Sequence, residues 1–228
     1  MSGNEILSAL RRSCHVVGYL GTNQMGKTHL MEEHAEKWQA LNPDCRILRV
    51  GKWAQDKGGV WVRGADQDPK LLFPYIDKVT NFGEGPQRPT PANPNYVNPL
   101  VGLDGALIQF DDLDGFLPQR VKGTPYNSLF MENAHLRLDV QFTAHRPQTI
   151  DKNVLNACHY LYVFSMGENY AREYIESMPE LRGSEVVRRN LFPRKRGQYV
   201  VIRNDPATHV PVGADFVDGY RPELDEAA

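Results

Sequence analysis

The run GTNQMGKT at residues 21–28 constrains this chain more than any other feature, because it has the form G-x-x-x-x-G-K-T. An apolar run typical of a buried strand precedes it, and a helical pattern follows over 28–41. A loop between a strand and a helix can turn its backbone N–H groups and the positive end of the helix dipole toward a phosphate. The pattern therefore predicts a nucleoside triphosphate site. The plain alternative is a glycine turn that carries a surface lysine.

Each fixed position of this loop has an expected role. Lys27 is expected to reach the β- and γ-phosphates, and the Thr28 hydroxyl is expected to ligate Mg²⁺. Gly21 and Gly26 allow the tight backbone turn that brings the N–H groups inward. The residues expected to contact the nucleotide are Gly21, Thr22, Asn23, Gln24, Met25, Gly26, Lys27, Thr28 and His29.

Strand-like and helical patterns alternate along the chain. The expected strands are Val16–Leu20, Arg46–Val50, Ala106–Phe110, 140–143, Tyr160–Phe164 and 199–202. The expected helices are 28–41, about 69–79, about 126–138, Lys152–Ala157 and 168–178. This alternation predicts an α/β fold with a mostly parallel central sheet flanked by helices. In such sheets the ligand binds beyond the carboxyl ends of the strands, which is where the glycine loop falls.

Length and composition favour an ordinary folded protein with one domain over residues 1–228. Residues 82–102 are rich in Gly, Pro and Asn, which neither a helix nor an inner strand tolerates, so we expect an irregular excursion there. Three widely spaced cysteines give no zinc-binding pattern and fit a reducing compartment. The sequence shows no signal-peptide pattern and no stretch of the apolar length of a membrane span.

The formal net charge of −2 conceals a basic segment at residues 182–203, which carries seven Lys or Arg residues and one acid, Glu185. A basic stretch in a near-neutral protein suggests local contact with a polyanion such as nucleic acid. Two other interpretations remain open. The segment is a solvated face, or it is a loop folded over the phosphates of the nucleotide.

A second motif follows the apolar run Ala106–Phe110, which ends in Asp111 and Asp112. An acid at the tip of a buried strand behind a glycine loop is the Walker B arrangement, in which Asp111 would hold the Mg²⁺ shell. Asp112 would polarise the attacking water, with Asp114 as the fallback for this role. The alternative is a strand that ends in a polar turn.

A third polar strand end follows at residues 143–147, Thr-Ala-His-Arg-Pro. If this strand lies beside the Walker B strand, its tip is placed to touch the γ-phosphate or the attacking water. His145 is the candidate sensor, with Thr143 and Arg146 as neighbours. The alternative for His145 is a loop histidine with ordinary hydrogen bonds.

These three motifs, in this order, resemble those of the FtsK–HerA superfamily of DNA-pumping ATPases, which commonly carry an Ala-Thr-Gln-Arg-Pro-like stretch after Walker B. His145 stands where Gln is typical of that family. The short chain is most similar to the genome-packaging ATPases of tailless, membrane-containing double-stranded DNA viruses, the PRD1-type lineage. The resemblance covers about residues 16–174.

This resemblance implies a P-loop NTPase fold of the RecA/ASCE type, with ATP and Mg²⁺ as cofactors. It implies a homo-oligomeric ring, a hexamer or a pentamer, that pumps double-stranded DNA into a capsid. A portal-vertex protein of the capsid is then an expected partner. The expected location is the packaging vertex of the virion, or the host cytoplasm.

The resemblance also implies an arginine that completes the nucleotide site of a neighbouring subunit. Arg172 is the first candidate, and Arg146, Arg137 and Arg120 follow it. The alternative for Arg172 is a surface helix residue paired with an acid four positions away, Glu168 or Glu176. Residues 119–124 and the basic cluster at 188–196 are the two candidate DNA-contacting segments.

The leading hypothesis is thus an ATP-driven translocase of double-stranded DNA. A P-loop kinase acting on a small molecule is the second hypothesis, although two adjacent acids at the Walker B tip do not favour it. The third is an NTP-dependent assembly or DNA-transfer protein that does not package a genome. Asp112 keeps the third open, because related ATPases usually carry Glu at that position.

Overall fold

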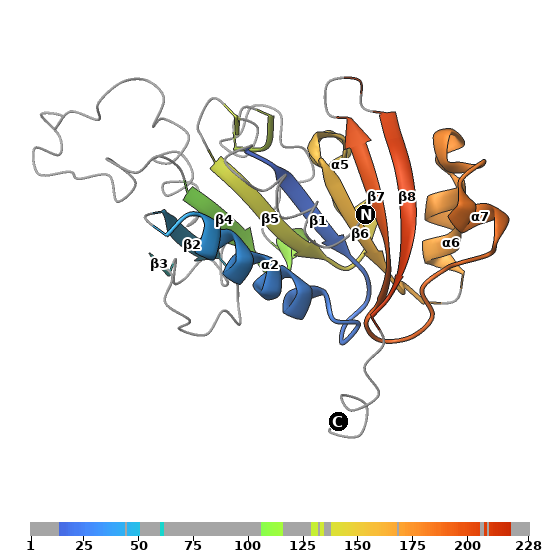
Figure 1. Ribbon diagram of the computed structural model, residues 1–228, viewed down its shortest axis with the longest axis horizontal. Coiled ribbons are helices and arrows are strands. Elements are labelled where there is room, and N and C mark those ends of the chain that lie inside the picture. The colour runs from blue at the N-terminus through green and yellow to red at the C-terminus, as the bar shows by residue number, and fades with distance from the viewer. Residues whose placement is uncertain are drawn as a thin grey trace, which may run out of the picture.

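In the computed structural model, one eight-stranded sheet organises the described residues, with helices on both faces (Figure 1). The structure describes residues 14–43, 45–50, 60–61, 106–115, 129–131, 133–134, 138–167, 169–205, 208 and 210–219. The strands are β1 (Val16–Leu20), β2 (Arg46–Val50), β3 (Val60–Trp61), β4 (Ala106–Phe110), β5 (Leu138–Ala144), β6 (Tyr160–Phe164), β7 (Gln198–Asp205) and β8 (Val210–Asp218). The α-helices are α2 (Lys27–Leu41), α5 (Lys152–Ala157), α6 (Tyr170–Glu176) and α7 (Glu185–Arg188). Short 3₁₀ turns are η3 (Leu113–Gly115), η4 (Pro147–Thr149) and η5 (Pro179–Leu181).

The strand order is β3-β2-β4-β5-β1-β6-β7-β8. The pairs from β3 to β6 are all parallel, whereas β7 runs antiparallel to both β6 and β8. The predicted α/β class with a mostly parallel sheet is confirmed. In this order β1 lies between β5 and β6, so the loop that follows β1 emerges between two neighbouring strand ends.

Side chains of the central strands alternate between the two faces, as the two-residue period of a strand requires. On one face, apolar side chains such as Ile108, Val140 and Phe142 pack with residues of α5, α6 and α7 in the largest core cluster. Position 18 of β1 is a glycine on this face, since an added Cβ would come within 2.7 Å of the Phe142 ring.

Helix α2 covers the other face, over β1, β2 and β5. Its buried side chains include Leu30, Met31, Ala35 and Trp38, the helical spacing that the sequence predicted. Polar contacts also hold it to the sheet: Trp38 Nε1 donates to Asp139 Oδ2 at 2.9 Å. These contacts fix where the helix begins and therefore where Lys27 lies.

Several predicted elements have the expected bounds, and others differ. Strands β1, β2, β4 and β6 and helix α5 coincide with the predicted ranges, whereas β5 and β7 are longer than predicted. Leu138, predicted to end a helix, instead begins β5, and the described residues 129–131 are helical. The predicted helix at 69–79 and the excursion at 82–102 lie outside the described residues.

Strand β8 was not among the predicted strands. Strand β8 contains Pro211 and Gly213, which disfavour an inner strand but are accepted at a sheet edge. Arg203 of β7 pairs with Asp215 at 3.0 Å across the hairpin. Within the described ranges, none of the helices is long and apolar enough to cross a membrane.

Two buried histidines predict how the stability of the fold depends on pH. Burial lowers the pKa of both His15 and His34 to about 4, from an ordinary value of 6.5; His159 adds to the effect at His15 and Lys37 at His34. The unfolded chain therefore binds more protons between pH 6.5 and 4, so the free energy of unfolding falls as the pH is lowered through this window. We expect a loss of the order of 2 kcal/mol per histidine.

Urea unfolding between pH 7.5 and 4.5 measures this loss. His34→Gln keeps a hydrogen-bonding group for the Tyr19 hydroxyl, which lies 2.7 Å from His34 Nδ1, and should flatten the pH dependence. His29→Gln, on an exposed position of the same helix, is the matched control and should leave the slope unchanged. An unaltered slope in His34→Gln would contradict the assignment.

Candidate nucleotide site

The loop at residues 21–28 is held at its start by the ends of the two strands that flank β1. Gly21 N donates to Ala144 O at the end of β5, and Thr22 N donates to Ser165 O just after β6, each at 3.0 Å. The Thr22 hydroxyl donates to the same Ser165 carbonyl at 3.1 Å. The first two residues of the loop are therefore fixed by the sheet itself.

The backbone of this loop requires glycine at two places. Gly21 has φ 155° and Gly26 has φ 100°, in the region that residues with a Cβ rarely adopt. A Cβ on Gly21 would also lie 2.7 Å from Phe164 Cβ. Gly26 then caps the N-terminus of α2, so the helix dipole points into the concave side of the loop.

Lys27 is buried at the first position of α2, and its Nζ donates to Thr22 O at 3.0 Å. Burial lowers the pKa of this ammonium group, and the carboxylates of Asp112, Asp111 and Asp114 act in the opposite direction. The lysine thus lies across the loop, within the field of the acids that follow β4. A phosphate chain in the loop would give Lys27 Nζ an anionic partner in place of the neutral Thr22 carbonyl.

Asp111 accepts two hydroxyl hydrogen bonds on a single oxygen. Thr28 Oγ1 donates to Asp111 Oδ1 at 3.1 Å, and Thr143 Oγ1 donates to the same oxygen at 2.8 Å. The backbone N–H of Asp111 donates to Val50 O at the end of β2. The structure therefore brings together Thr28 and Asp111, which the sequence assigned to one Mg²⁺ site from positions 83 residues apart.

Thr143 also orients the second acid. Its Oγ1 accepts a hydrogen bond from the Asp112 N–H at 2.7 Å, and Asp112 has a left-handed φ of 55°. Burial, and then the neighbouring Asp111, raise the pKa of the half-buried Asp112 carboxyl. From the sequence, Thr143 was expected only as a neighbour of His145. Its role in joining both acids depends on the pairing of β4 with β5, which no local pattern reveals.

His145 bridges the loop and the turn after β4. Its Nδ1 lies 3.0 Å from Asp114 Oδ2, and its Nε2 lies 2.6 Å from Asn23 Oδ1. The same Nδ1 is 3.9 Å from Asp112 Oδ1. His145, the candidate sensor, thus lies in contact with both the glycine loop and the acids. Asp114, the fallback for the water-polarising acid, is the partner of the histidine ring.

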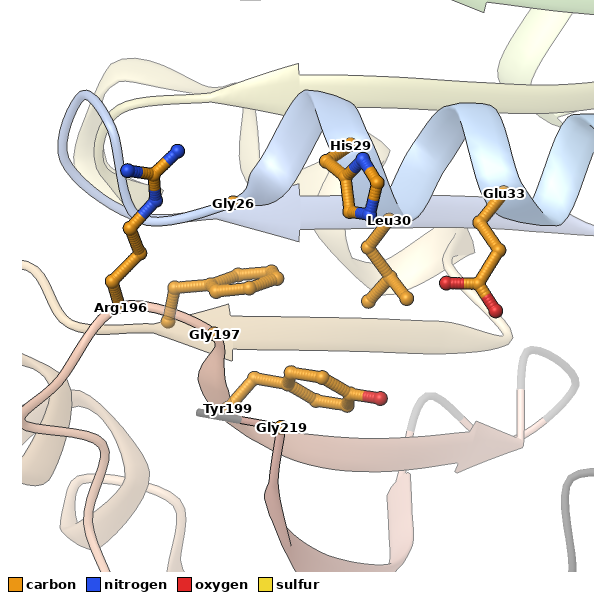
Figure 2. Close-up of a pocket in the computed structure, with 9 residues that line it drawn as sticks. Gly26, His29, Leu30, Glu33, Arg196, Gly197, Tyr199 and Gly219 are labelled. Carbon is orange, nitrogen blue, oxygen red and sulfur yellow. The ribbon is translucent and has the colours of Figure 1, made fainter. Parts of the chain in front are cut away.

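Other predicted residues of the loop lie around this centre. Gln24 is exposed with a φ of 62°, and Met25 packs against the cluster under α2. His29 is exposed on the first turn of α2 and lines a cavity of about 230 Å³ beside Gly26. Figure 2 shows this cavity between α2 and the chain that enters β7.

The basic residues 194–196 lie next to the loop. Gly197 N donates to Met25 O at 3.1 Å, and Arg196 lines the same cavity as Gly26 (Figure 2). Gln198 Oε1 accepts from the N–H groups of Arg194 and Lys195, which shapes the turn. This placement agrees with the alternative that part of the basic segment folds over the nucleotide phosphates.

The Arg172 guanidinium is exposed on α6 and pairs with Glu176 Oε1 at 2.8 Å. It also lies 5.4 Å from the centre of the Phe192 ring. The structure therefore shows the helix ion pair that was the alternative for this residue. Arg172 lines a hollow of about 500 Å³ together with Ser165 and Arg194. Of the other candidates, Arg146 is exposed. Arg137, Arg120, Glu168 and the segment 119–124 lie outside the described residues.

The fold of this chain is similar to that of several proteins of known structure. No protein-family model and no curated protein matches the sequence. The structure is similar to the genome packaging NTPase B204 from Sulfolobus turreted icosahedral virus 2 in complex with AMPPCP, with a TM-score of 0.57 and 11% identity over 90% of this chain and 98% of that one.

Two larger proteins are also similar. ATPases 2 and 3 of EssC from Geobacillus thermodenitrificans match with a TM-score of 0.55 and 11% identity, over 92% of this chain and 40% of that one. The pCW3 conjugation coupling protein TcpA matches with a TM-score of 0.55 and 12% identity, over 94% and 62%. The glycine loop, the sheet order and these similarities together show that this chain has the fold of a P-loop NTPase, a fold it shares with the packaging NTPase B204.

Proposed function

We propose that this chain is an ATP-driven translocase of double-stranded DNA that works as a homo-oligomeric ring and packages a viral genome. The observation that carries the proposal is the meeting of the Thr28 and Thr143 hydroxyls on Asp111 Oδ1, beside the buried Lys27. This arrangement combines a phosphate loop with an acid at the tip of a neighbouring strand, which is the machinery of nucleotide hydrolysis.

The residues present fit a magnesium ion. Mg²⁺ prefers oxygen ligands and binds through one or two protein groups together with phosphate oxygens. Thr28 Oγ1 and Asp111 are the groups that would hold it, since their oxygens already lie 3.1 Å apart. When bound, the ion neutralises charge that develops on the β- and γ-phosphates.

Hydrolysis needs a group that orients the attacking water and accepts its proton. The Asp112 carboxyl, with its raised pKa, is a better proton acceptor than an ordinary exposed aspartate. The Thr143 hydroxyl holds the backbone of Asp112, and Lys27 would neutralise charge on the transferred phosphoryl group. The reaction cleaves the bond between the β- and γ-phosphates and yields ADP and inorganic phosphate.

His145 is the residue through which this site would sense the γ-phosphate. It contacts Asn23 of the loop through Nε2 and Asp114 through Nδ1, so a nucleotide that displaces Asn23 changes the partner of one ring nitrogen. Asp114 holds the ring in place while this happens. Bridges of this kind transmit occupancy of a site to the segments that hold it.

The coupling to DNA is supported by the shared fold with B204, which is a DNA-packaging ATPase. The ring is proposed from the resemblance of the motifs to the FtsK–HerA superfamily. The exposed Arg172 is available to a neighbouring subunit, where an arginine in trans would stabilise transition-state charge. A capsid protein at the packaging vertex of a virion is the partner that we propose for the ring. The PRD1-type lineage remains a proposal from the motifs.

The proposed function predicts an ATPase that double-stranded DNA stimulates. Lys27→Ala should lower turnover by several orders of magnitude, because it removes the cation that faces the phosphates. Phosphate release with and without duplex DNA measures this, with Lys152→Ala, an exposed lysine of α5, as the matched control. Turnover that ignores DNA, or transfer of phosphate to a small molecule, would favour the assembly-protein or kinase hypothesis.

Mixing wild-type protein with an Arg172 variant tests whether Arg172 acts in trans. In a ring whose subunits depend on one another, an Arg172→Ala subunit silences its neighbour, so activity should fall faster than the fraction of wild-type protein. Lys152→Ala, at an exposed position outside the basic segment, is the control. Activity that declines in simple proportion to the wild-type fraction would contradict the trans role.

Thr143→Val tests the link between the two acids. Valine keeps the shape of threonine but removes the hydroxyl that contacts Asp111 and Asp112, so we expect kcat to fall by about 10- to 100-fold. Thr143→Ser, which keeps the hydroxyl, should recover most of the activity. An unchanged kcat in Thr143→Val together with a loss in Thr143→Ser would show that the methyl packing, rather than the hydrogen bonds, matters.

A further inference from the structure

Three potential metal ligands meet beside the glycine loop, and none of them belongs to the Mg²⁺ position at Thr28 and Asp111. One ligand atom from each of Asp112, Asp114 and His145 lies within 4.8 Å of the other two. His145 Nδ1 is 3.0 Å from Asp114 Oδ2 and 3.9 Å from Asp112 Oδ1. A four-coordinate Zn²⁺ ion with ligands at about 2.1 Å places neighbouring ligand atoms about 3.4 Å apart, so these two separations bracket the distance that such an ion requires.

The hydrogen bonds of His145 leave one ring nitrogen for a cation. Nε2 lies 2.6 Å from Asn23 Oδ1, and Nδ1 faces the Asp114 carboxylate. Both partners are acceptors, whereas a neutral imidazole carries a single N–H and can donate to only one of them. With the proton on Nε2, the Nδ1 lone pair points at a carboxylate oxygen. A metal ion at Nδ1 removes this repulsion, and metal-bound histidines typically donate their other N–H to an oxygen in this way.

The second oxygen of Asp114 points to the same ion. Asp114 Oδ1 is buried and accepts no hydrogen bond within the part of the chain that the structure describes. A buried carboxylate oxygen without a donor costs free energy, and a bound cation offsets this cost. A second proton on His145 would serve only Asp114 Oδ2, whereas a divalent ion stabilises the whole carboxylate.

The charges around the cluster also favour a further cation. Asp111, Asp112 and Asp114 lie within four positions after β4, and Lys27 lies in the field of all three carboxylates. One ammonium group offsets only one of these negative charges. A Mg²⁺ ion at Thr28 and Asp111 would arrive with phosphate groups, which add negative charge of their own. The side of the cluster next to His145 therefore keeps an excess of negative charge.

The ligand types select an ion different from Mg²⁺. Mg²⁺ prefers oxygen ligands throughout, whereas an imidazole nitrogen suits Zn²⁺ and similar transition ions. One histidine and two carboxylates also make three protein ligands, the number found in zinc sites that keep a fourth position open. A glutamine in place of His145 would lack the ring nitrogen on which this selection depends.

We propose that Asp112, Asp114 and His145 form a second cation site, which takes Zn²⁺ or a similar transition ion and blocks hydrolysis while it is filled. The ion occupies the Asp112 carboxylate and joins the turn after β4 to the tip of β5. The site itself stands on the geometry of the three side chains. Only the block rests on the proposed function, because it assumes that Asp112 accepts the proton of the attacking water.

The test measures Zn²⁺ binding by calorimetry, without nucleotide and in excess Mg²⁺, which keeps the Thr28 and Asp111 position filled. Wild-type protein should bind one Zn²⁺ ion that His145→Gln and Asp114→Asn each weaken by more than about 100-fold. Asn23→Ala, which removes only the partner of Nε2, should weaken binding by a smaller factor, about tenfold.

The chain has seven histidines and three cysteines, so matched variants separate this site from other Zn²⁺ binding. His29→Gln and Glu36→Gln, at exposed positions of α2, should leave the affinity unchanged. Equal affinity in the wild type, His145→Gln and Asp114→Asn would overturn the proposed site. Loss of the binding in excess Mg²⁺ would overturn it too, because the ion would then belong to the Thr28 and Asp111 position.

The block is tested by phosphate release from Mg²⁺–ATP with and without buffered Zn²⁺. Turnover of the wild type should fall as Zn²⁺ fills the site, whereas the residual turnover of His145→Gln should ignore Zn²⁺ at the same concentrations. If Zn²⁺ binds as described but wild-type turnover is unchanged, the block is overturned and the site stands. If the protein binds Zn²⁺ but hydrolyses no ATP, the proposed function and the block fall together, while the cation site remains.

Discussion

The phosphate loop is hydrogen-bonded at its start to the chain at the ends of β5 and β6, and the rest of the site depends on this constraint. The backbone N–H groups of Gly21 and Thr22 are bonded to Ala144 O and Ser165 O, so the loop inherits its position from the sheet. This is possible because β1 is central and parallel to both neighbours, which places three strand ends together. His145 and Ser165, each directly after one of these strands, therefore flank the loop.

The position of α2 is fixed by buried polar contacts as well as by its apolar face. The buried Asp139 accepts hydrogen bonds from the His15 N–H at 2.7 Å and from Trp38 Nε1 at 2.9 Å. Gln109 donates to Gln141 Oε1 on the next strand. Such contacts have one good geometry each, whereas apolar packing alone tolerates small shifts. A helix held in this way presents its first turn, with Lys27 and Thr28, at a defined place.

The bounds of several strands could be predicted from local sequence patterns. Contacts between distant segments could not, because they depend on how the strands pair. Strands β1, β4 and β6 are short apolar runs buried on both faces, so their bounds could be predicted from the sequence. Strand β5 begins two residues before its predicted start because the polar Asp139 lies beneath α2 and interrupts the apolar pattern. The contact of His145 with Asn23 spans 122 residues, and it follows only from the pairing of β1 with β5. The cavity near Glu33 could not be predicted either, because it forms only where the start of β7 lies beside the loop and α2.

The side chains around the glycine loop come from opposite sides of β1. The acids and His145 belong to the turns after β4 and β5, whereas Tyr199 belongs to the antiparallel hairpin of β7 and β8, and Arg196 lies in the turn that leads into it. Substitutions in the hairpin can therefore reshape the cavity without moving the strands that carry the acids. This separation lets the hairpin be redesigned to admit a ligand of another shape while the strands that carry the acids stay in place.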